Sequence, residues 1–273
     1  MQTIMSNQEL EVDPDTMDFY RQVLETLNES GVPFLVGGAY AFNYYTGVNR
    51  QTRDLDLFIR RCDYERISEV LLPAGFETEL TFPHWLGKIR FRDTYIDLIF
   101  SSGNAIAEVD DLWFDHATDA EVMGIPTKFS PVEEMIWSKA FIMERERFDG
   151  ADVIHLLLMR GAEMDWQRLL ERFDPHWRIL LSHFVLFGFI YPAHRNLIPA
   201  WIMDNLLERL EHEVHTDPPK TDICQGTLLS REQYLTDIHQ QGLKDGRIIP
   251  FGNMTPRDTQ RWTDAIAGDH DPN

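Results

Sequence analysis

The chain has little cysteine, few basic residues and no long apolar run. Two of its 273 residues are cysteine, Cys62 and Cys224, which excludes a disulfide framework and favours a reducing compartment. Lysine and arginine number 25 against 45 aspartate and glutamate, a net charge of −20. Tight sequence-independent binding to long nucleic acids needs clustered basic side chains, so this balance argues against it without excluding a local basic patch.

The remaining absences concern targeting and membranes. The N-terminal sequence Met-Gln-Thr-Ile-Met-Ser-Asn has neither the basic nor the apolar region of a signal peptide. The most apolar run, residues 179–190, is too short to span a bilayer and is interrupted by Ser182 and His183. We therefore expect a cytoplasmic protein with no membrane partner. Its 43% hydrophobic and 26% charged residues are typical of a globular protein.

The most informative stretch runs from Phe34 to Ile59. Its pattern predicts a buried strand, a Gly37-Gly38 turn, a short helix, and a second strand that carries Asp54 and Asp56. Residues two apart on a strand share a face, so both carboxylates point the same way. Like charges this close repel unless a cation lies between them, and carboxylates with substrate phosphates suit Mg²⁺, with Mn²⁺ as the alternative ion. A glycine turn at the start of a helix offers backbone N–H groups to phosphate.

Each of these features also has an ordinary structural explanation. The two aspartates fit the polar half of an alternating strand, although aspartate is depleted in strands and two at this spacing are unusual. The glycine pair fits a structural turn, because it lacks the Walker pattern and the third glycine of a dinucleotide fingerprint. Arg50 and Arg53, before the second strand, are candidate phosphate ligands or ordinary surface arginines.

Two further residues join the candidate site. Asp97 lies in an otherwise apolar strand, where burying a lone carboxylate is costly unless it has a partner. Beside the first pair it would be a ligand of a second metal or the base for an attacking hydroxyl; otherwise it is a polar residue of an edge strand. Lys139 lies on the apolar face of a helix, either extending past that face to water or contacting a nucleotide phosphate.

The order of predicted elements gives an α+β fold: an α/β core with a mixed, partly antiparallel sheet, followed by an all-helical region. A helix begins at Asp13-Pro14 and ends at Gly31. Strands are expected over 34–36, 54–59, 76–82, 86–91 and 94–100, with helices over 39–45 and 63–72.

Two capping boxes mark helix starts in the second half, at Ser130–Glu133 and Ser230–Gln233. Helices are expected over 131–147, 150–160, 165–173, 175–190, 199–214 and 230–242. We therefore expect a catalytic core over residues 1–129, a helical domain over 130–245 and a polar C-terminal tail over 246–273.

A glycine pair, a helix, Asp-x-Asp on a strand and a lone aspartate on a later strand resemble the nucleotidyltransferase superfamily of the polymerase-β type. This similarity covers about residues 30–100. Within the superfamily the chain resembles the bacterial abortive-infection, type IV toxin branch and its uncharacterised relatives. That branch has a lysine in the first helix after the catalytic half and an Asp-x-x-Asp soon after, which Lys139 and Asp149-Gly-Ala-Asp152 match. Where the superfamily often has Gly-Ser at the turn, this chain has Gly37-Gly38, so a serine contact to phosphate is missing.

The resemblance implies Mg²⁺-dependent transfer of a nucleoside monophosphate from an NTP to an acceptor hydroxyl, with release of pyrophosphate. Asp54 and Asp56 would hold the metal with Asp97, which would also activate the hydroxyl. Gly37, Gly38, Arg50, Arg53, Lys139 and Asp152 would bind the nucleotide. The acceptor would be a small molecule, a protein or RNA. Two alternatives stay open: a toxin that modifies RNA, with a cognate antitoxin-like partner, and a non-catalytic nucleotide-binding or partner-binding module.

Overall fold

The structure is a computed structural model, which describes residues 13–52 and 54–269. It forms two compact units, with the division between Pro131 and Val132. The functional assignment of a catalytic core, a helical domain and a polar tail stays a prediction. Both cysteines are free thiols, as expected.

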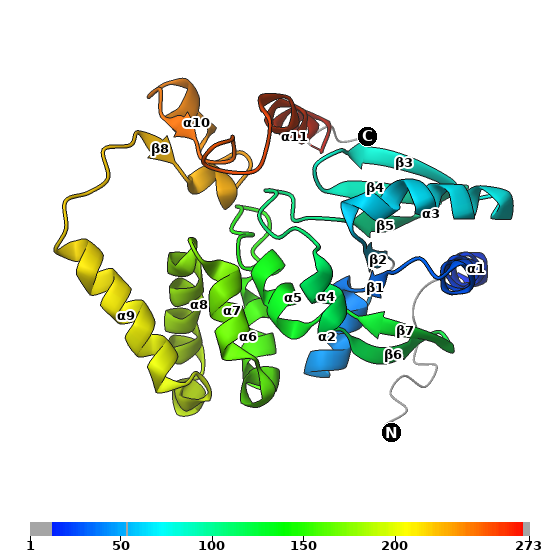
Figure 1. The fold of residues 1–273 in the computed structure, drawn as a ribbon, viewed down its shortest axis with the longest axis horizontal. Helices are drawn as coiled ribbons and strands as arrows, with labels where there is room; N and C mark the ends of the chain where they lie inside the picture. Colours follow the sequence, from blue (N-terminus) through cyan, green and yellow to red (C-terminus); the bar gives the residue numbers. More distant parts are fainter. Residues whose placement is uncertain (1–12, 53, 270–273) are drawn as a thin grey trace. The chain divides into compact units, whose positions relative to one another are not determined.

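The first unit is built on a mixed sheet of seven strands in the order β3-β4-β5-β2-β1-β7-β6 (Figure 1). The strands are β1 (Leu35–Val36), β2 (Leu55–Phe58), β3 (Glu77–Phe82), β4 (Leu86–Phe91), β5 (Thr94–Ile99), β6 (Thr118–Val122) and β7 (Ile125–Phe129). β2 is parallel to β5 and β1 is parallel to β7, whereas the other neighbours are antiparallel. The expected α+β fold with a partly antiparallel sheet is confirmed.

The described residues of this unit form the α-helices α1 (Pro14–Ser30), α2 (Gly38–Thr46), α3 (Tyr64–Leu71) and α4 (Asp111–Asp115). The predicted ends of α1 are confirmed, because the Asp13 carboxylate accepts a hydrogen bond from the Thr16 N–H and Gly31 adopts φ 67° after the last turn. Residues 101–129, for which no element was expected, contain α4 and the β6–β7 hairpin.

The second unit is largely helical. It contains α5 (Val132–Lys139), α6 (Gly150–Arg160), α7 (Trp166–Phe173), α8 (Trp177–Ile190), α9 (Ala200–Val214), α10 (Leu235–His239) and α11 (Pro256–Asp269). The prediction that it is all-helical is wrong in one detail, since β8 (Ile223–Cys224) and β9 (Lys244–Asp245) form a small parallel sheet. The segment expected to be a polar tail contains α11.

Two predicted helices are much shorter than expected. The helix predicted over 131–147 ends at Lys139, because the Met143 N–H donates to Leu229 O and the Glu144 N–H to Arg147 O instead of continuing the helix. The helix predicted over 230–242 spans only Leu235–His239.

The two capping boxes also differ from the prediction. The Ser130 N–H donates to Val36 O in the first unit, while the Glu133 carboxylate accepts a hydrogen bond from the Asp165 N–H in the second, so the first box does not form. In the second box the Ser230 hydroxyl accepts from the Gln233 N–H at 3.2 Å, but regular helix begins only at Leu235.

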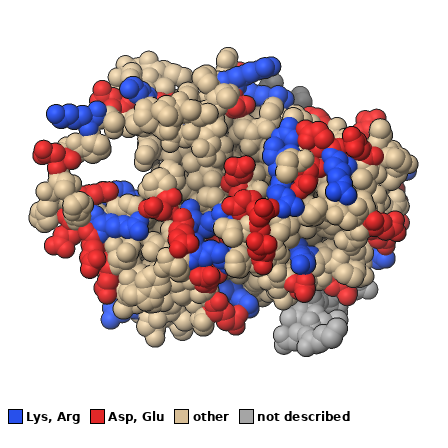
Figure 2. Space-filling model, in the orientation of Figure 1, with Lys and Arg blue, Asp and Glu red and all other residues tan. Residues whose placement is uncertain are grey.

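Charged side chains of both signs lie interspersed on the face shown in Figure 2. Several basic residues are committed to ion pairs inside one unit, among them Lys88 with Asp97 and Arg168 with Glu133. Each such pair neutralises one cation together with one carboxylate, so the net acidic excess is unchanged, while fewer cations are available to an anionic partner.

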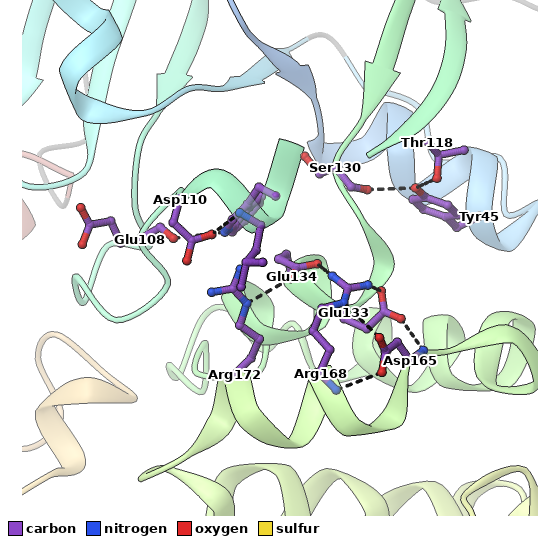
Figure 3. Close-up of polar contacts among 12 residues, drawn as sticks. Tyr45, Glu108, Asp110, Thr118, Ser130, Glu133, Glu134, Asp165, Arg168 and Arg172 are labelled. Carbon is purple, nitrogen blue, oxygen red and sulfur yellow. Dashed lines mark hydrogen bonds and ion pairs between the residues drawn. The ribbon is translucent and has the colours of Figure 1, made fainter. Parts of the chain in front are cut away.

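A buried acid–base network joins α5 to α7 within the second unit (Figure 3). Glu134 has no exposed side-chain surface and accepts from both Arg168 (2.5 Å) and Arg172 (3.0 Å). Glu133 accepts from Arg168 and from the Asp165 N–H, both at 2.6 Å. Removing one member of such a network would leave an uncompensated buried charge, so it fixes how these two helices pack.

Candidate active site

The Gly37-Gly38 turn follows β1 and packs directly against Asp56. The Gly37 N–H donates to the Asp56 carbonyl oxygen at 3.0 Å, and Gly38 opens α2 with φ +53°. A Cβ at Gly38 would lie 1.7 Å from the Asp56 Oδ2 atom, and one at Gly37 would lie 2.2 Å from the ring of Phe58. Neither position has room for a side chain, which explains the glycine pair.

This contact also refines the predicted phosphate-binding role of the turn. Because the Gly37 N–H is engaged with Asp56, it is not an open donor for an anion. Gly38 is in the first turn of α2, where backbone N–H groups have no acceptor within the helix. An anion at this helix start would therefore meet the first-turn N–H groups that begin at Gly38.

The strand register brings the third carboxylate beside the first pair. β2 and β5 are parallel, with Asp56 opposite Asp97, so both side chains lie on the same face of the sheet. Asp54 immediately precedes β2 and is exposed. Burial raises the pKa of Asp97, and the charge of Asp54 adds to this effect, whereas the ammonium of Lys88 opposes it. The Asp97 carboxyl therefore senses both a carboxylate and an ammonium group.

Lys88 is also part of this cluster, although it is not among the residues predicted for the site. β4 and β5 are antiparallel with Lys88 opposite Asp97, and the Lys88 Nζ atom lies 2.8 Å from Asp97 Oδ1. The sequence nevertheless contains a feature that predicts the pairing of Lys88 with Asp97. The turn expected at Arg92-Asp93 fixes the register of the hairpin, and counting back from it places residue 88 opposite residue 97.

Two buried tyrosines, Tyr20 and Tyr40, lie near the carboxylates. Burial raises the pKa of Tyr20 to about 12, with the charge of Asp54 acting in the same direction. Burial also raises the pKa of Tyr40, as do Tyr20, Asp56 and Asp54. Both phenols are therefore neutral at physiological pH. Within the described residues, the Tyr40 hydroxyl has no hydrogen-bond partner.

The predicted arginine contacts are only partly described. Arg50 is exposed between α2 and β2, with its guanidinium 4.7 Å from the centre of the Phe42 ring and its N–H donating to Asn43 Oδ1. Arg53 lies outside the described residues. A role for either arginine in binding phosphate stays a prediction.

Lys139 and Asp152, the other predicted nucleotide contacts, lie in the second unit. The Lys139 Nζ atom is 2.8 Å from Asp152 Oδ2 and 3.1 Å from Asp149 Oδ2. Burial by itself would raise the pKa of Asp149, but the hydrogen bond from Arg147 and the charge of Lys139 outweigh it and lower that pKa. Lys139 therefore does not extend to water, and its ammonium is shared by two carboxylates. Its contact with a nucleotide stays a prediction.

The carboxylates suit Mg²⁺ in chemistry but do not form a complete metal site by themselves. Across residues 13–52 and 54–269, no three His, Cys, Asp or Glu side chains are grouped so as to hold a metal ion. Mg²⁺ commonly binds one or two carboxylates and takes its other ligands from substrate phosphates and water. Asp54 and Asp56 supply such oxygen donors, so these residues fit the ion together with a bound triphosphate.

This arrangement defines a class of protein. A mixed sheet with carboxylates on neighbouring parallel strands, and a glycine turn against one of them, is the core of a polymerase-β-type nucleotidyltransferase. Residues 17–212 match the family described as uncharacterised nucleotidyltransferases, and the chain belongs to that family. A comparison with curated proteins finds no match.

Solved structures with a similar fold include the antibiotic-resistance factor ANT(2'')-Ia, with 16% identity, a TM-score of 0.36, and coverage of 74% of this chain and 100% of that one. The lincosamide antibiotic adenylyltransferase LnuA gives 14% identity and a TM-score of 0.37, covering 53% of this chain and 96% of LnuA. JHP933 from Helicobacter pylori gives 12% identity and a TM-score of 0.33, covering 75% and 97%. The family assignment rests on the family match and not on these structures.

Proposed function

We propose that the chain transfers a nucleoside monophosphate from an NTP to an acceptor hydroxyl and releases pyrophosphate. The observation that carries this proposal is the register of β2 and β5, which puts Asp97 beside Asp56 while the Gly37-Gly38 turn packs against Asp56. Membership of a nucleotidyltransferase family supports the same reaction class.

The donor side of the site is assigned to three residues. Asp54 and Asp56 would hold Mg²⁺, which when bound neutralises charge on the triphosphate and on the leaving pyrophosphate. The first turn of α2, beginning at Gly38, would bind the β- and γ-phosphates through backbone N–H groups. Because Asp56 also packs against Gly38, the metal ligand and the phosphate donors are held at a fixed separation.

Asp97 is assigned to the acceptor. It would take the proton of the acceptor hydroxyl as that oxygen forms a bond to the α-phosphorus, and the bond from the α-phosphorus to the pyrophosphate oxygen would break. Arg50, Arg53, Lys139 and Asp152 remain predicted nucleotide contacts.

We propose the chemical class of the acceptor from the net charge of the chain. The net charge of −20 favours a small-molecule or protein acceptor over RNA. A toxin that modifies RNA would use the same donor chemistry and would differ only in the acceptor. In the described part of the chain no helix is long and apolar enough to cross a membrane.

A labelling experiment tests the proposal. The protein is incubated with each α-labelled NTP, Mg²⁺ and a cell extract, and the products are treated with nuclease or protease to identify the acceptor. We expect label on an acceptor with the unmodified chain and a loss of at least about 10²-fold with Asp56→Asn, because one metal ligand is removed. Asp119→Asn is the matched control, since Asp119 is an exposed strand residue on β6. Bound NTP without transferred label in any reaction would favour the non-catalytic module.

A further inference from the structure

A row of three charged side chains crosses neighbouring strands of the first unit. Lys88 on β4 is opposite Asp97 on β5, and Asp97 is opposite Asp56 on β2. Residues directly opposite each other share a face of the sheet, so one cation and two carboxylates lie side by side. Lys88 therefore lies at one end of this row, next to Asp97, and Asp56 lies at the other end.

Two contacts hold this ammonium in place. It lies 2.8 Å from Asp97 Oδ1 and 3.4 Å from the centre of the Tyr95 ring. Tyr95 and Asp97 are two residues apart on β5 and share a face, so Lys88 contacts both at once. The Lys88 side chain is only 15% exposed. A lysine held by a carboxylate and an aromatic ring has lost the freedom of a surface lysine.

The position of Lys88 matters for metal binding. Sites with two divalent ions place them about 3.5–4 Å apart, and the second ion needs carboxylate oxygens beside those that hold the first. At this site Asp97 is the carboxylate next to Asp56, and one of its oxygens already accepts a hydrogen bond from an ammonium. A second divalent ion there would have to displace Lys88 or lie close to its charge.

We propose that the Lys88 ammonium takes the place of a second divalent ion, so that the site binds a single divalent cation on Asp54 and Asp56. Lys88 is then a positioning residue: it occupies one oxygen of Asp97 and leaves the other for the acceptor hydroxyl. The role given to Lys88 rests on the proposed nucleotidyl transfer. The number of divalent ions that the chain binds, however, can be measured without any transfer reaction.

The test counts Mn²⁺ ions bound by the full chain, using the electron paramagnetic resonance signal of free Mn²⁺ during a titration with the metal alone. Without nucleotide, water can supply the ligands that a triphosphate would otherwise provide, so we expect one ion per chain in the unmodified protein and in Lys88→Arg, which keeps the charge. Lys88→Met keeps most of the side-chain stem and removes the charge, so we expect two ions. Lys88→Met combined with Asp97→Asn should return to one. Lys128→Met is the control for loss of an exposed lysine.

Two ions in the unmodified chain, one ion in Lys88→Met, or no Mn²⁺ bound by the unmodified chain would overturn the proposal. Circular dichroism of each variant verifies that it is folded, and Lys88→Arg provides a second folded variant. The outcome is distinct from that of the labelling experiment. A chain that transfers label but binds two ions refutes only the role of Lys88, whereas a change from one ion to two without transferred label refutes only the proposed function.

Discussion

The side chain of Asp56 limits which residue can occupy position 38. The Asp56 carboxylate lies where a side chain at Gly38 would have to be, and Gly38 adopts φ +53°. A second glycine, Gly47, has a similar φ of +69° after the last turn of α2, but a Cβ there would meet nothing within 4 Å. The two glycines therefore separate the effect of backbone conformation from the effect of the contact with Asp56.

We predict that Gly38→Ala lowers nucleotidyl transfer by at least about 10²-fold, because Asp56 must move and its metal geometry is lost. Gly47→Ala should destabilise the protein by about 1 kcal/mol through its left-handed backbone while transfer by the folded protein changes little. The labelling assay and urea unfolding of both variants measure the two effects. Equal loss of transfer in both variants would show that the contact with Asp56 is unimportant.

Tyr40 carries a buried hydroxyl group whose effect on the free energy of unfolding can be measured. Its side chain is 2% exposed, and its hydroxyl has no hydrogen-bond partner in the described part of the chain. A buried unpaired polar group is unfavourable by about 1–3 kcal/mol. We therefore predict that Tyr40→Phe leaves the free energy of unfolding unchanged or raises it by up to about 1 kcal/mol. A loss of more than about 1 kcal/mol, measured by urea unfolding, would contradict this reading.

His183 makes stability depend on pH. Burial lowers its pKa, and its hydrogen bond to Ala140 O opposes this effect only in part. The unfolded chain gains a proton near pH 6.5, whereas the folded chain stays neutral to lower pH, so stability is complete above about 6.5 and falls as the pH falls toward the folded pKa. His176 acts in the same direction.

We accordingly predict a lower urea midpoint at pH 5.5 than at pH 7.5, with a smaller difference in His183→Gln. His215→Gln is the control for loss of an exposed histidine side chain. An unchanged dependence in His183→Gln would mean that other groups cause it.

At the scale of elements, locally encoded features were predicted and long-range ones were not. α1 follows from Asp13-Pro14 and Gly31, which act within a few residues. The early end of α5 could not be predicted, because it depends on a hydrogen bond from Met143 to Leu229, far along the chain. α11 was missed because its sequence is polar enough to resemble a tail.

The candidate site divides in the same way. Asp54, Asp56 and the glycine pair lie in one short stretch of the chain, so the sequence pattern alone predicts that they belong to one site. Lys88 was missed, because a lone lysine in a strand is usually a solvated residue and only the hairpin register puts it opposite Asp97. The sequence also does not predict the ion pairs of Lys139 with Asp149 and Asp152, because it does not show which side chains face each other across a turn.

The packing of α5 on α7 gives a prediction at this scale. Glu134 is fully buried and pairs with both Arg168 and Arg172, so Glu134→Ala removes the carboxylate that these two guanidinium groups share and should lower the free energy of unfolding by about 3–5 kcal/mol. Glu65→Ala removes an exposed partner of Arg61 and should change it by less than about 1 kcal/mol. Chemical denaturation of both variants measures the difference, and similar values would show that the buried network contributes no more than a surface pair.

At the scale of the whole molecule, the chain belongs to a nucleotidyltransferase family, and its composition bears on the proposed acceptor. The family match spans residues 17–212 and so includes the β2–β5 site as well as α5 to α8. Many of the basic side chains that might have met a nucleic acid are paired with carboxylates of the protein. The proposal of a small-molecule or protein acceptor accords with this arrangement.

The most direct test of the central claim compares two labels on the same NTP. Nucleotidyl transfer breaks the bond between the α-phosphorus and the pyrophosphate oxygen, so the acceptor should carry the α-label and the γ-label should appear in pyrophosphate. Asp56→Asn should abolish both products together. A γ-label on the acceptor would mean transfer of the terminal phosphate, and neither label on any acceptor, with the NTP still bound, would contradict the assignment of these carboxylates to catalysis.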